Sequence, residues 1–208
     1  GLTINGTGPG AVVLSGANTY TGATTVSGAT TLLINGNQSA ATGAVNVSAG
    51  TLGGTGTIGG ATTVQTGGTL SPGDPATNGG IGTLAFGSGI TLQSGSTVNL
   101  QINGATFTST DGFGYNLPGT PGYEAYVIAN SGGSGGTQHD QLVFTGAVTQ
   151  ATGAKINVLP SSYTAVAGQI INLIDWSDLL GSSFSTNLGD TIRDGSSDSA
   201  FDLDLPDI

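Results

Sequence analysis

Cysteine and methionine are both absent from this 208-residue sequence, and charged residues make up only 7% of it. The lack of cysteine excludes a disulfide framework and thiol chemistry. Without methionine the sequence cannot carry its own start codon, so we expect a processed product or a fragment. No apolar run approaches the ~18 residues that span a bilayer. No charged-then-apolar leader precedes Gly1, and we expect any export signal to have been removed or to lie outside this sequence.

Basic residues are also nearly absent. Lys155 and Arg193 stand against 12 acidic residues, and the sequence pI is about 4.1. Such a chain cannot neutralise many phosphates, which excludes DNA and RNA as partners. Anionic membrane surfaces are disfavoured for the same reason, and we expect no membrane insertion. Asp74 is the only charged side chain before Thr110, so the first half of the chain is almost neutral.

Glycine is abundant instead, with 39 residues. Between the glycines, short segments alternate Val, Ile or Leu with Thr or Asn, as in Val45-Asn46-Val47. Alternation of period two over about four to six residues is typical of half-buried strands. It also argues against a disordered linker, which a sequence so low in charge and so rich in Gly, Ser and Thr could otherwise indicate. No apolar stripe of helical period extends over ten residues, so we expect almost no helix.

The strand-like segments form an internal repeat. Each copy has a strand, a glycine-containing corner and a second strand, and the copies lie at residues 22–32, 43–52, 60–70, 89–98 and 146–156. Val26, Val47 and Val64 are 21 and 17 residues apart, which gives a unit of about 19 residues. A unit this small cannot bury an apolar face alone, so stacked copies must complete a common core.

This repeat predicts an all-β β-solenoid, in which each strand pairs in parallel with its copy one coil away at ~4.8 Å. About eight coils would form a rod of about 40 Å. Glycine at the corners would supply the positive φ that the bends require. Asn-Gly steps at residues 5–6, 35–36 and 103–104 each follow an Ile. We interpret them as left-handed corners rather than hairpin turns.

One segment has a more specific pattern. Residues 14–26 contain Asn18, Thr19, Tyr20, Thr21 and Gly22 in the order Asn-Thr-Tyr-Thr-Gly, followed by Ala-Thr-Thr-Val. This pattern resembles the signature of the autotransporter-associated β-strand repeat, found in the passenger regions of large exported bacterial proteins. The resemblance is close over residues 10–35 and looser to about residue 104. It implies a right-handed parallel β-helix, an extracellular or bacterial cell-surface location, and a mechanical or adhesive role.

We divide the sequence into three parts. Residues 1–104 hold the repeating solenoid coils, and residues 105–139 form a flanking insertion rich in Gly, Pro and aromatic residues. Residues 140–208 continue the solenoid and end in an acidic C-terminal end piece.

Parallel β-helices also carry polysaccharide lyases and hydrolases, and their chemistry needs paired carboxylates, or carboxylates with a base and calcium, on adjacent coils. In the repeat coils, Asp74 is the single carboxylate, and its Pro-Gly-Asp-Pro context predicts a turn. His139 and Asp140 suggest a triad with a serine. No Gly-x-Ser-x-Gly elbow surrounds a suitable serine, so we expect a solvated loop there. We assign no catalytic residue and no enzymatic activity.

The tail has the densest group of carboxylates, which is the place where we would expect calcium if the chain binds it. The candidate ligands are Asp190, Asp194, Asp198, Asp202 and Asp204. Their spacing matches neither an EF-hand loop nor a calcium-binding nonapeptide, so a solvated acidic end is the alternative. No other cofactor is expected.

Two further interpretations concern the insertion and the single lysine. Tyr115, Tyr123 and Tyr126 could stack on the sugar rings of an extracellular glycan, or pack as a cluster that covers the solenoid flank. Lys155 and Glu124 are the sole lysine and glutamate, the residues that an isopeptide cross-link to an Asn would require. Nothing in the sequence brings them together.

A solenoid has open strand edges at its ends. Because residues 1–4 are already strand-like, either Gly1 marks a cut within a longer passenger or the first coil stacks on a neighbouring subunit. Head-to-tail stacking would generate a filament. We therefore predict a non-enzymatic extracellular structural protein, a stalk or fibre segment that self-associates through its solenoid ends. The alternative is an adhesion or glycan-binding passenger module that uses the insertion.

Overall fold

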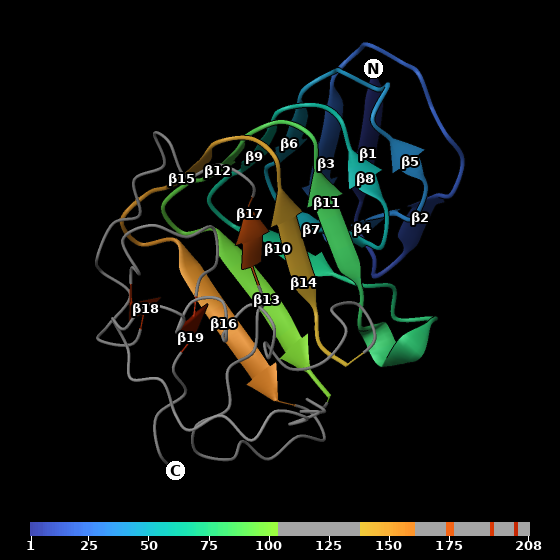
Figure 1. Ribbon diagram of the computed structural model, residues 1–208. Coiled ribbons are helices and arrows are strands. Elements are labelled where there is room, and N and C mark those ends of the chain that lie inside the picture. The colour runs from blue at the N-terminus through green and yellow to red at the C-terminus, as the bar shows by residue number, and fades with distance from the viewer. Residues whose placement is uncertain (104–137, 161–173, 177–191, 194–201, 204–208) are drawn as a thin grey trace.

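A computed structural model of the chain describes residues 1–103, 138–160, 174–176, 192–193 and 202–203. The chain winds repeatedly through three parallel sheets, so that each strand lies beside its copy from the next turn of the chain (Figure 1). We call one such turn a coil and number the coils 1 to 6 from the N-terminal end. The predicted all-β β-solenoid is confirmed.

The first strand of each coil lies in one six-stranded sheet, sheet A, in chain order. Its strands are β1 (Leu2–Gly6), β3 (Thr24–Gly28), β6 (Val45–Val47), β9 (Thr62–Val64), β12 (Ile90–Leu92) and β15 (Val148–Gln150). The second strand of each coil lies in sheet B, also six-stranded. Its strands are β2 (Ala11–Leu14), β4 (Thr31–Ile34), β7 (Gly50–Gly54), β10 (Gly68–Pro72), β13 (Thr97–Ile102) and β16 (Lys155–Pro160).

A third strand, in sheet C, completes coils 2 to 6. Its strands are β5 (Asn37–Gln38), β8 (Thr57–Ile58), β11 (Thr83–Phe86), β14 (Gln141–Phe144) and β17 (Ile174–Trp176). A short antiparallel pair, β18 (Ile192–Arg193) with β19 (Asp202–Leu203), forms a separate sheet. The one described helix is a 3-10 turn, η1 (Asn78–Gly80). Within the described residues, no helix is long and apolar enough to cross a bilayer.

The repeat copies stack in register, as the sequence predicted, and their inward side chains form continuous columns. The sheet A column is Ile4, Val26, Val47, Val64, Leu92 and Gln150. The sheet B column is Val12, Leu32, Leu52, Leu70, Val98 and Ile156. The sheet C column includes Gln38, Ile58, Phe86 and Phe144, and the rings of Phe86 and Phe144 stack at 5.1 Å. These columns are the core.

The fourth copy begins one residue earlier than predicted, at Ser88 rather than at Gly89. Thr62 pairs with Ile90, so Gly89 stands opposite Ala61 and not opposite Gly60. The coil lengths also vary more than a 19-residue unit allows. In sheet A the paired residues are 22, 21 and 17 residues apart in the first coils, then 28 and 58. The described residues therefore make six coils, because long connections replace the further coils that a uniform repeat would give.

Glycines with positive φ occupy the corner between sheets A and B, as predicted. Gly28, Gly50, Gly67, Gly95 and Gly153 have φ between 73° and 89°, one in each of coils 2 to 6. A side chain with a Cβ would be strained in this conformation, so glycine recurs at this corner of the repeat.

The Asn-Gly steps do not form left-handed corners, and this prediction was wrong. Asn5 and Gly6 belong to strand β1, and Gly36 does not have a positive φ. Asn35 is held instead by side-chain hydrogen bonds to distant parts of the chain. The third step includes Gly104, which lies outside the described residues.

Candidate functional site at the insertion corner

The corner between sheets B and C differs from the other corners because it accepts long insertions. In coils 2 and 3 only two residues separate the strands. In coil 4 the connection is residues 73–82, and in coil 5 it is residues 103–140. We call this place the insertion corner. Because β10 pairs with β13 and β11 pairs with β14, the connections of coils 4 and 5 begin and end on neighbouring strands.

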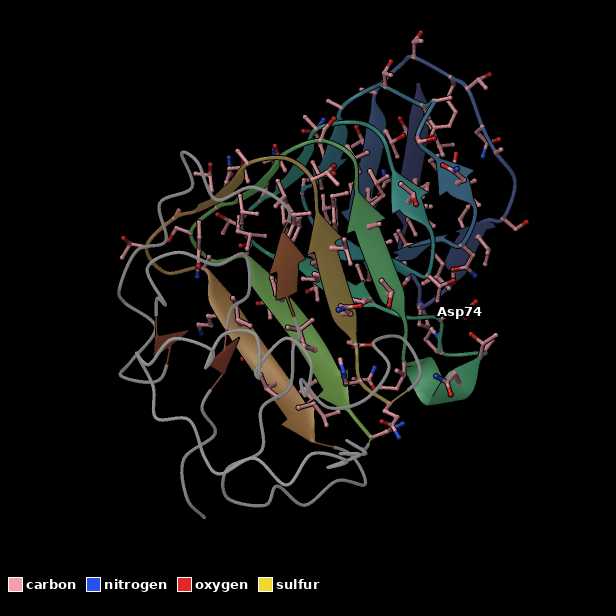
Figure 2. All side chains as sticks on the ribbon, in the orientation of Figure 1. Asp74 is labelled. Atoms are coloured by element: carbon pink, nitrogen blue, oxygen red, sulfur yellow. The ribbon has the colours of Figure 1, made fainter. Side chains whose placement is uncertain are left out.

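Asp74 anchors the first of these connections. It is buried and lies beside the η1 turn (Figure 2). One carboxylate oxygen accepts a hydrogen bond from Nδ2 of Asn35 at 2.7 Å, and the other accepts one from the backbone N–H of Ala76 at 2.9 Å. The N–H of Thr77 donates to the Asp74 carbonyl, which closes the predicted turn. Asp74 thus ties the coil 4 connection to the corner of coil 2.

Asp140 closes the second connection. Its carboxylate accepts hydrogen bonds from the backbone N–H of Gly82 at 3.0 Å and of Gln101 at 2.8 Å. The backbone N–H of Asp140 donates in turn to the Gln101 carbonyl. Gly82 ends the coil 4 connection, and Gln101 precedes the coil 5 connection. One fully buried carboxylate therefore holds the bases of both insertions together.

The pKa of Asp140 is raised from 3.8 to about 6. Burial is the main cause, because desolvation disfavours the charged carboxylate. The hydrogen bonds from Gln101 and Gly82 oppose this effect, since they stabilise the charged form. Two backbone donors are not enough to offset the loss of water.

His139 is buried as well, with 1% of its surface exposed. Its Nδ1 lies 2.9 Å from the carbonyl oxygen of Asp140. A carbonyl can only accept, so Nδ1 carries the proton and donates it. The predicted solvated loop at residues 139–140 is therefore wrong. His139 is buried because it forms an isolated antiparallel β-bridge with Ile102 at the base of the insertion.

This base forms a closed neck. The N–H of Asn103 donates to the carbonyl of Gln138 at 2.8 Å, next to the antiparallel bridge between Ile102 and His139. The coil 4 connection packs against the same neck. A Cβ atom on Gly80 would lie 3.2 Å from Nε2 of Gln101, which indicates how closely the two connections approach. The insertion thus leaves the solenoid from a fixed point.

The other predicted site residues lie mostly beyond the described chain. Tyr115, Tyr123, Tyr126 and Glu124 fall outside the described residues, as do all the candidate calcium ligands except one. The exception, Asp202, belongs to β19. Within the described residues, no three acidic or histidine side chains converge on a point that could hold a metal ion. Calcium binding and glycan stacking therefore stay predictions.

The signature residues contribute to the solenoid wall. Residues 15–23 take the place of a sheet C strand in coil 1. The Tyr20 hydroxyl lies 2.9 Å from Oγ1 of Thr24, and Nε2 of Gln38 donates to the carbonyl of Gly16. Gly22 lies against coil 2, where a Cβ on Gly43 would overlap its carbonyl oxygen. Tyr20 and Gly22 thus both contact coil 2.

A small apolar cavity lies in the solenoid interior between coils 4, 5 and 6. Its lining residues are Leu70, Leu92, Val98, Leu142, Phe144, Val148 and Ile156. The space suits about one water molecule and offers that water no polar partner, so it is a packing defect rather than a binding site.

Comparison with known families supports the resemblance. The model of the passenger-associated-transport-repeat matches residues 7–33, which contain Asn18, Thr19, Tyr20 and Gly22. The matched segment runs from the end of β1 to β4, so it covers one coil and its contact with the next. Comparison with curated proteins and with solved structures gives no match. The chain thus contains a repeat of the autotransporter-passenger type.

Proposed function

We propose that this chain is a non-enzymatic structural segment of an exported bacterial protein, and that it serves as a stalk at the cell surface or in the secreted part of that protein. The observation that carries the proposal is the in-register stacking of six coils, one of which matches the passenger repeat. A passenger repeat implies a cell-surface or secreted location.

The stacked coil suits a spacer because its main-chain hydrogen bonds between coils run along the solenoid axis. Each coil adds about 4.8 Å, so the coils that precede coil 4 place the first insertion at a defined height above the first coil. Fixed columns of Val, Leu and Phe side chains fill the interior, and close packing of this kind resists deformation. Uncharged Thr side chains such as Thr25, Thr63 and Thr91 face outward and keep the surface soluble without salt bridges.

The buried polar groups support a structural role rather than catalysis. The carboxylates of Asp74 and Asp140 are both engaged by backbone N–H groups, and Asp74 also by Asn35. A general acid or nucleophile must instead reach substrate. Nδ1 of His139 donates to a backbone carbonyl and so does not bind a catalytic carboxylate. We accordingly propose no enzymatic activity.

Surface labelling of intact cells tests this function. Antibodies raised against the purified chain should label intact cells of the source bacterium or its culture medium. Protease added to intact cells should remove the cell-bound signal, while a cytoplasmic marker protein survives. Labelling that appears only after the cells are lysed would contradict the proposal, as would release of sugars from a polysaccharide panel by the purified chain.

A second candidate function is adhesion through the insertion. The neck at residues 101–103 and 138–140 holds the insertion at one fixed corner, as a presented binding element requires. A glycan array would test it. We expect glycan binding to be lost when Tyr115, Tyr123 and Tyr126 are changed to Ala, and to survive in the control Tyr20→Phe, which removes only the hydroxyl that contacts Thr24. Absence of binding by the unaltered chain would end this alternative.

A further inference from the structure

One peptide bond at the insertion corner differs chemically from the other bonds of the chain. Asp74 is followed by Pro75, and this is the one Asp-Pro step in the sequence. The nitrogen of Pro75 belongs to a tertiary amide, and such a nitrogen takes up a proton and leaves its carbonyl more readily than that of a secondary amide. An aspartate carries a carboxylate close to its own carbonyl carbon, and carboxylates can act as nucleophiles. The bond therefore combines a neighbouring nucleophile with a good leaving group.

The fold holds the Asp74 carboxylate beside this bond. The backbone N–H of Ala76 donates to Oδ1 at 2.9 Å, and the ring that this hydrogen bond closes contains the Asp74–Pro75 bond itself. Nδ2 of Asn35 donates to Oδ2 at 2.7 Å. A carboxylate has about four lone-pair sites, so each oxygen keeps a lone pair beyond these bonds. The buried carboxylate is thus oriented, and it can attack its own carbonyl carbon although outside substrates do not reach it.

The carbonyl group of the same bond is polarised by two donors. The backbone N–H of Thr77 donates to the Asp74 carbonyl oxygen at 2.8 Å, and Oγ1 of Thr77 donates to it at 3.3 Å. Donors in this position stabilise the negative charge that develops on a carbonyl oxygen when a nucleophile adds to the carbon. The turn at Asp74 therefore supplies both the attacking group and the donors that stabilise the product of its attack.

The chain is fixed before this bond and open to solvent after it. Gly73 exchanges two backbone hydrogen bonds with Gly54 of coil 3, each at 2.8 Å. Residues 75–79 are exposed, so the nitrogen of Pro75 lies in a stretch where it can take a proton from solvent. A carbonyl held in place next to its nucleophile avoids the entropic cost of bringing the two together.

We propose that the chain cleaves its own Asp74–Pro75 bond. A carboxylate oxygen of Asp74 attacks the carbonyl carbon of the same residue, and the bond from that carbon to the nitrogen of Pro75 breaks. The nitrogen takes a proton from solvent and becomes a new N-terminal amine, while Asp74 becomes a cyclic anhydride. Water opens the anhydride, which restores the side-chain carboxylate and leaves a new C-terminal carboxylate. No outside substrate is turned over, so self-cleavage is compatible with a chain that is not an enzyme.

The two fragments, residues 1–74 and 75–208, remain joined through the sheets after cleavage. Across the cut, β11 pairs with β8, β12 pairs with β9, and β13 pairs with β10. Cleavage therefore opens the insertion corner without dismantling the stack of coils. The fragments separate only when the chain is unfolded, so they must be detected under denaturing conditions.

The rates of cleavage in the folded and the unfolded chain test the proposal. The purified chain is kept at one mildly acidic pH, with and without urea, and the products are identified by mass spectrometry. The folded chain should yield the two fragments at least about tenfold faster than the unfolded chain, because the fold holds the carboxylate and the donors in place. Equal rates would mean that the fold does not assist the reaction and would overturn the proposal, as would a folded chain that stays uncut.

Variants that stay folded by circular dichroism separate the roles of the groups. Asp74→Asn removes the nucleophile and Pro75→Ala removes the leaving group, so neither should be cut over the same period. Thr77→Val removes one donor to the carbonyl and should slow cleavage by about tenfold or more. The matched control Asp140→Asn alters the other buried carboxylate of the insertion corner and should be cut at the unaltered rate.

Cleavage that persists in Asp74→Asn, or that is lost equally in folded Asp140→Asn, would contradict the role of the Asp74 carboxylate. Self-cleavage goes beyond the stalk function and does not depend on it. Cell-surface labelling can fail while the purified chain is cut, and the reverse, so the two proposals fail separately.

Discussion

Glycine is required at several positions because neighbouring coils leave no space for a side chain. A Cβ on Gly60 would overlap the carbonyl oxygen of Gly43 in the coil before it. We expect Gly60→Ala to destabilise the fold by about 1–3 kcal/mol, the usual cost of overpacking. Gly10→Ala is the control, since a Cβ there has no atom within 4 Å. Urea unfolding followed by circular dichroism would measure both, and equal stability of the two variants would contradict close coil contact at residue 60.

Asp140 makes stability depend on pH. Because its folded pKa of about 6 exceeds its ordinary 3.8, the folded chain binds the proton more tightly than the unfolded chain does. Its stabilising contribution is therefore present at pH 3.8 and is lost as the pH rises through about 6. The loss amounts to at most about 3 kcal/mol.

The comparison that isolates this effect is Asp140→Asn, which does not titrate. We expect the free energy of unfolding of the unaltered chain to fall between pH 4 and pH 6.5 relative to that of the variant. The variant should be less stable at every pH, because its Nδ2 group faces a backbone donor. A constant difference between the two chains across this range would show that the carboxylate is not desolvated.

The sequence could predict the turn at Asp74 but not the burial of His139 and Asp140. Pro-Gly-Asp-Pro has local turn chemistry that needs no distant partner. The groups that donate hydrogen bonds to the Asp140 carboxylate belong to Gln101 and Gly82, which lie 39 and 58 residues away. A residue in a Gly/Ser-rich stretch gives no local sign of such contacts. Only the stacking of coil 5 on coil 4 brings them together.

At the scale of elements, the strands and their register were predictable because two patterns indicate the same strands. These patterns are the alternation of apolar and polar residues and the internal sequence repeat. Leu32, Leu52, Leu70, Val98 and Ile156 end the five aligned copies, and all five share one column. The Asn-Gly corners were mispredicted for the opposite reason. Asn35 has the local preference for a left-handed turn, yet its side chain bridges Thr55 and Asp74 from two later coils.

A double-mutant cycle on Asn35 and Asp74 measures the coupling free energy of the hydrogen bond that attaches the coil 4 connection to coil 2. We expect each single Ala substitution to destabilise the fold, and the two effects to be coupled by about 1–2 kcal/mol, because the hydrogen bond between them joins an amide to a carboxylate and is partly buried. Asn99→Ala with Asp74→Ala is the control cycle, since Asn99 bonds Asn157 instead. Additive effects in the first cycle would mean that the connection is held by other contacts.

At the scale of the molecule, the number of coils was overestimated because a uniform unit length was assumed. Residues inserted at the insertion corner lengthen a coil without adding a new one. No repeated motif in the sequence marks the position of this corner. After residues 103–140 the chain returns to the same stack of coils, and the strand pairing that results joins residues far apart in the sequence. Residue 97 of β13 pairs with residue 155 of β16 across that whole insertion.

Disulfide trapping across β13 and β16 most directly tests the claim that successive coils stack through parallel, in-register strands. Asn99 and Asn157 are in-register partners, and Nδ2 of Asn157 lies 2.9 Å from Oδ1 of Asn99. The double variants Asn99→Cys/Asn157→Cys and Thr97→Cys/Lys155→Cys should each oxidise to an intramolecular disulfide, because adjacent parallel strands fall within disulfide range. The crossed variant Thr97→Cys/Asn157→Cys should stay reduced. A disulfide in the crossed variant with none in the direct pairs would mean antiparallel pairing, and the solenoid would be wrong.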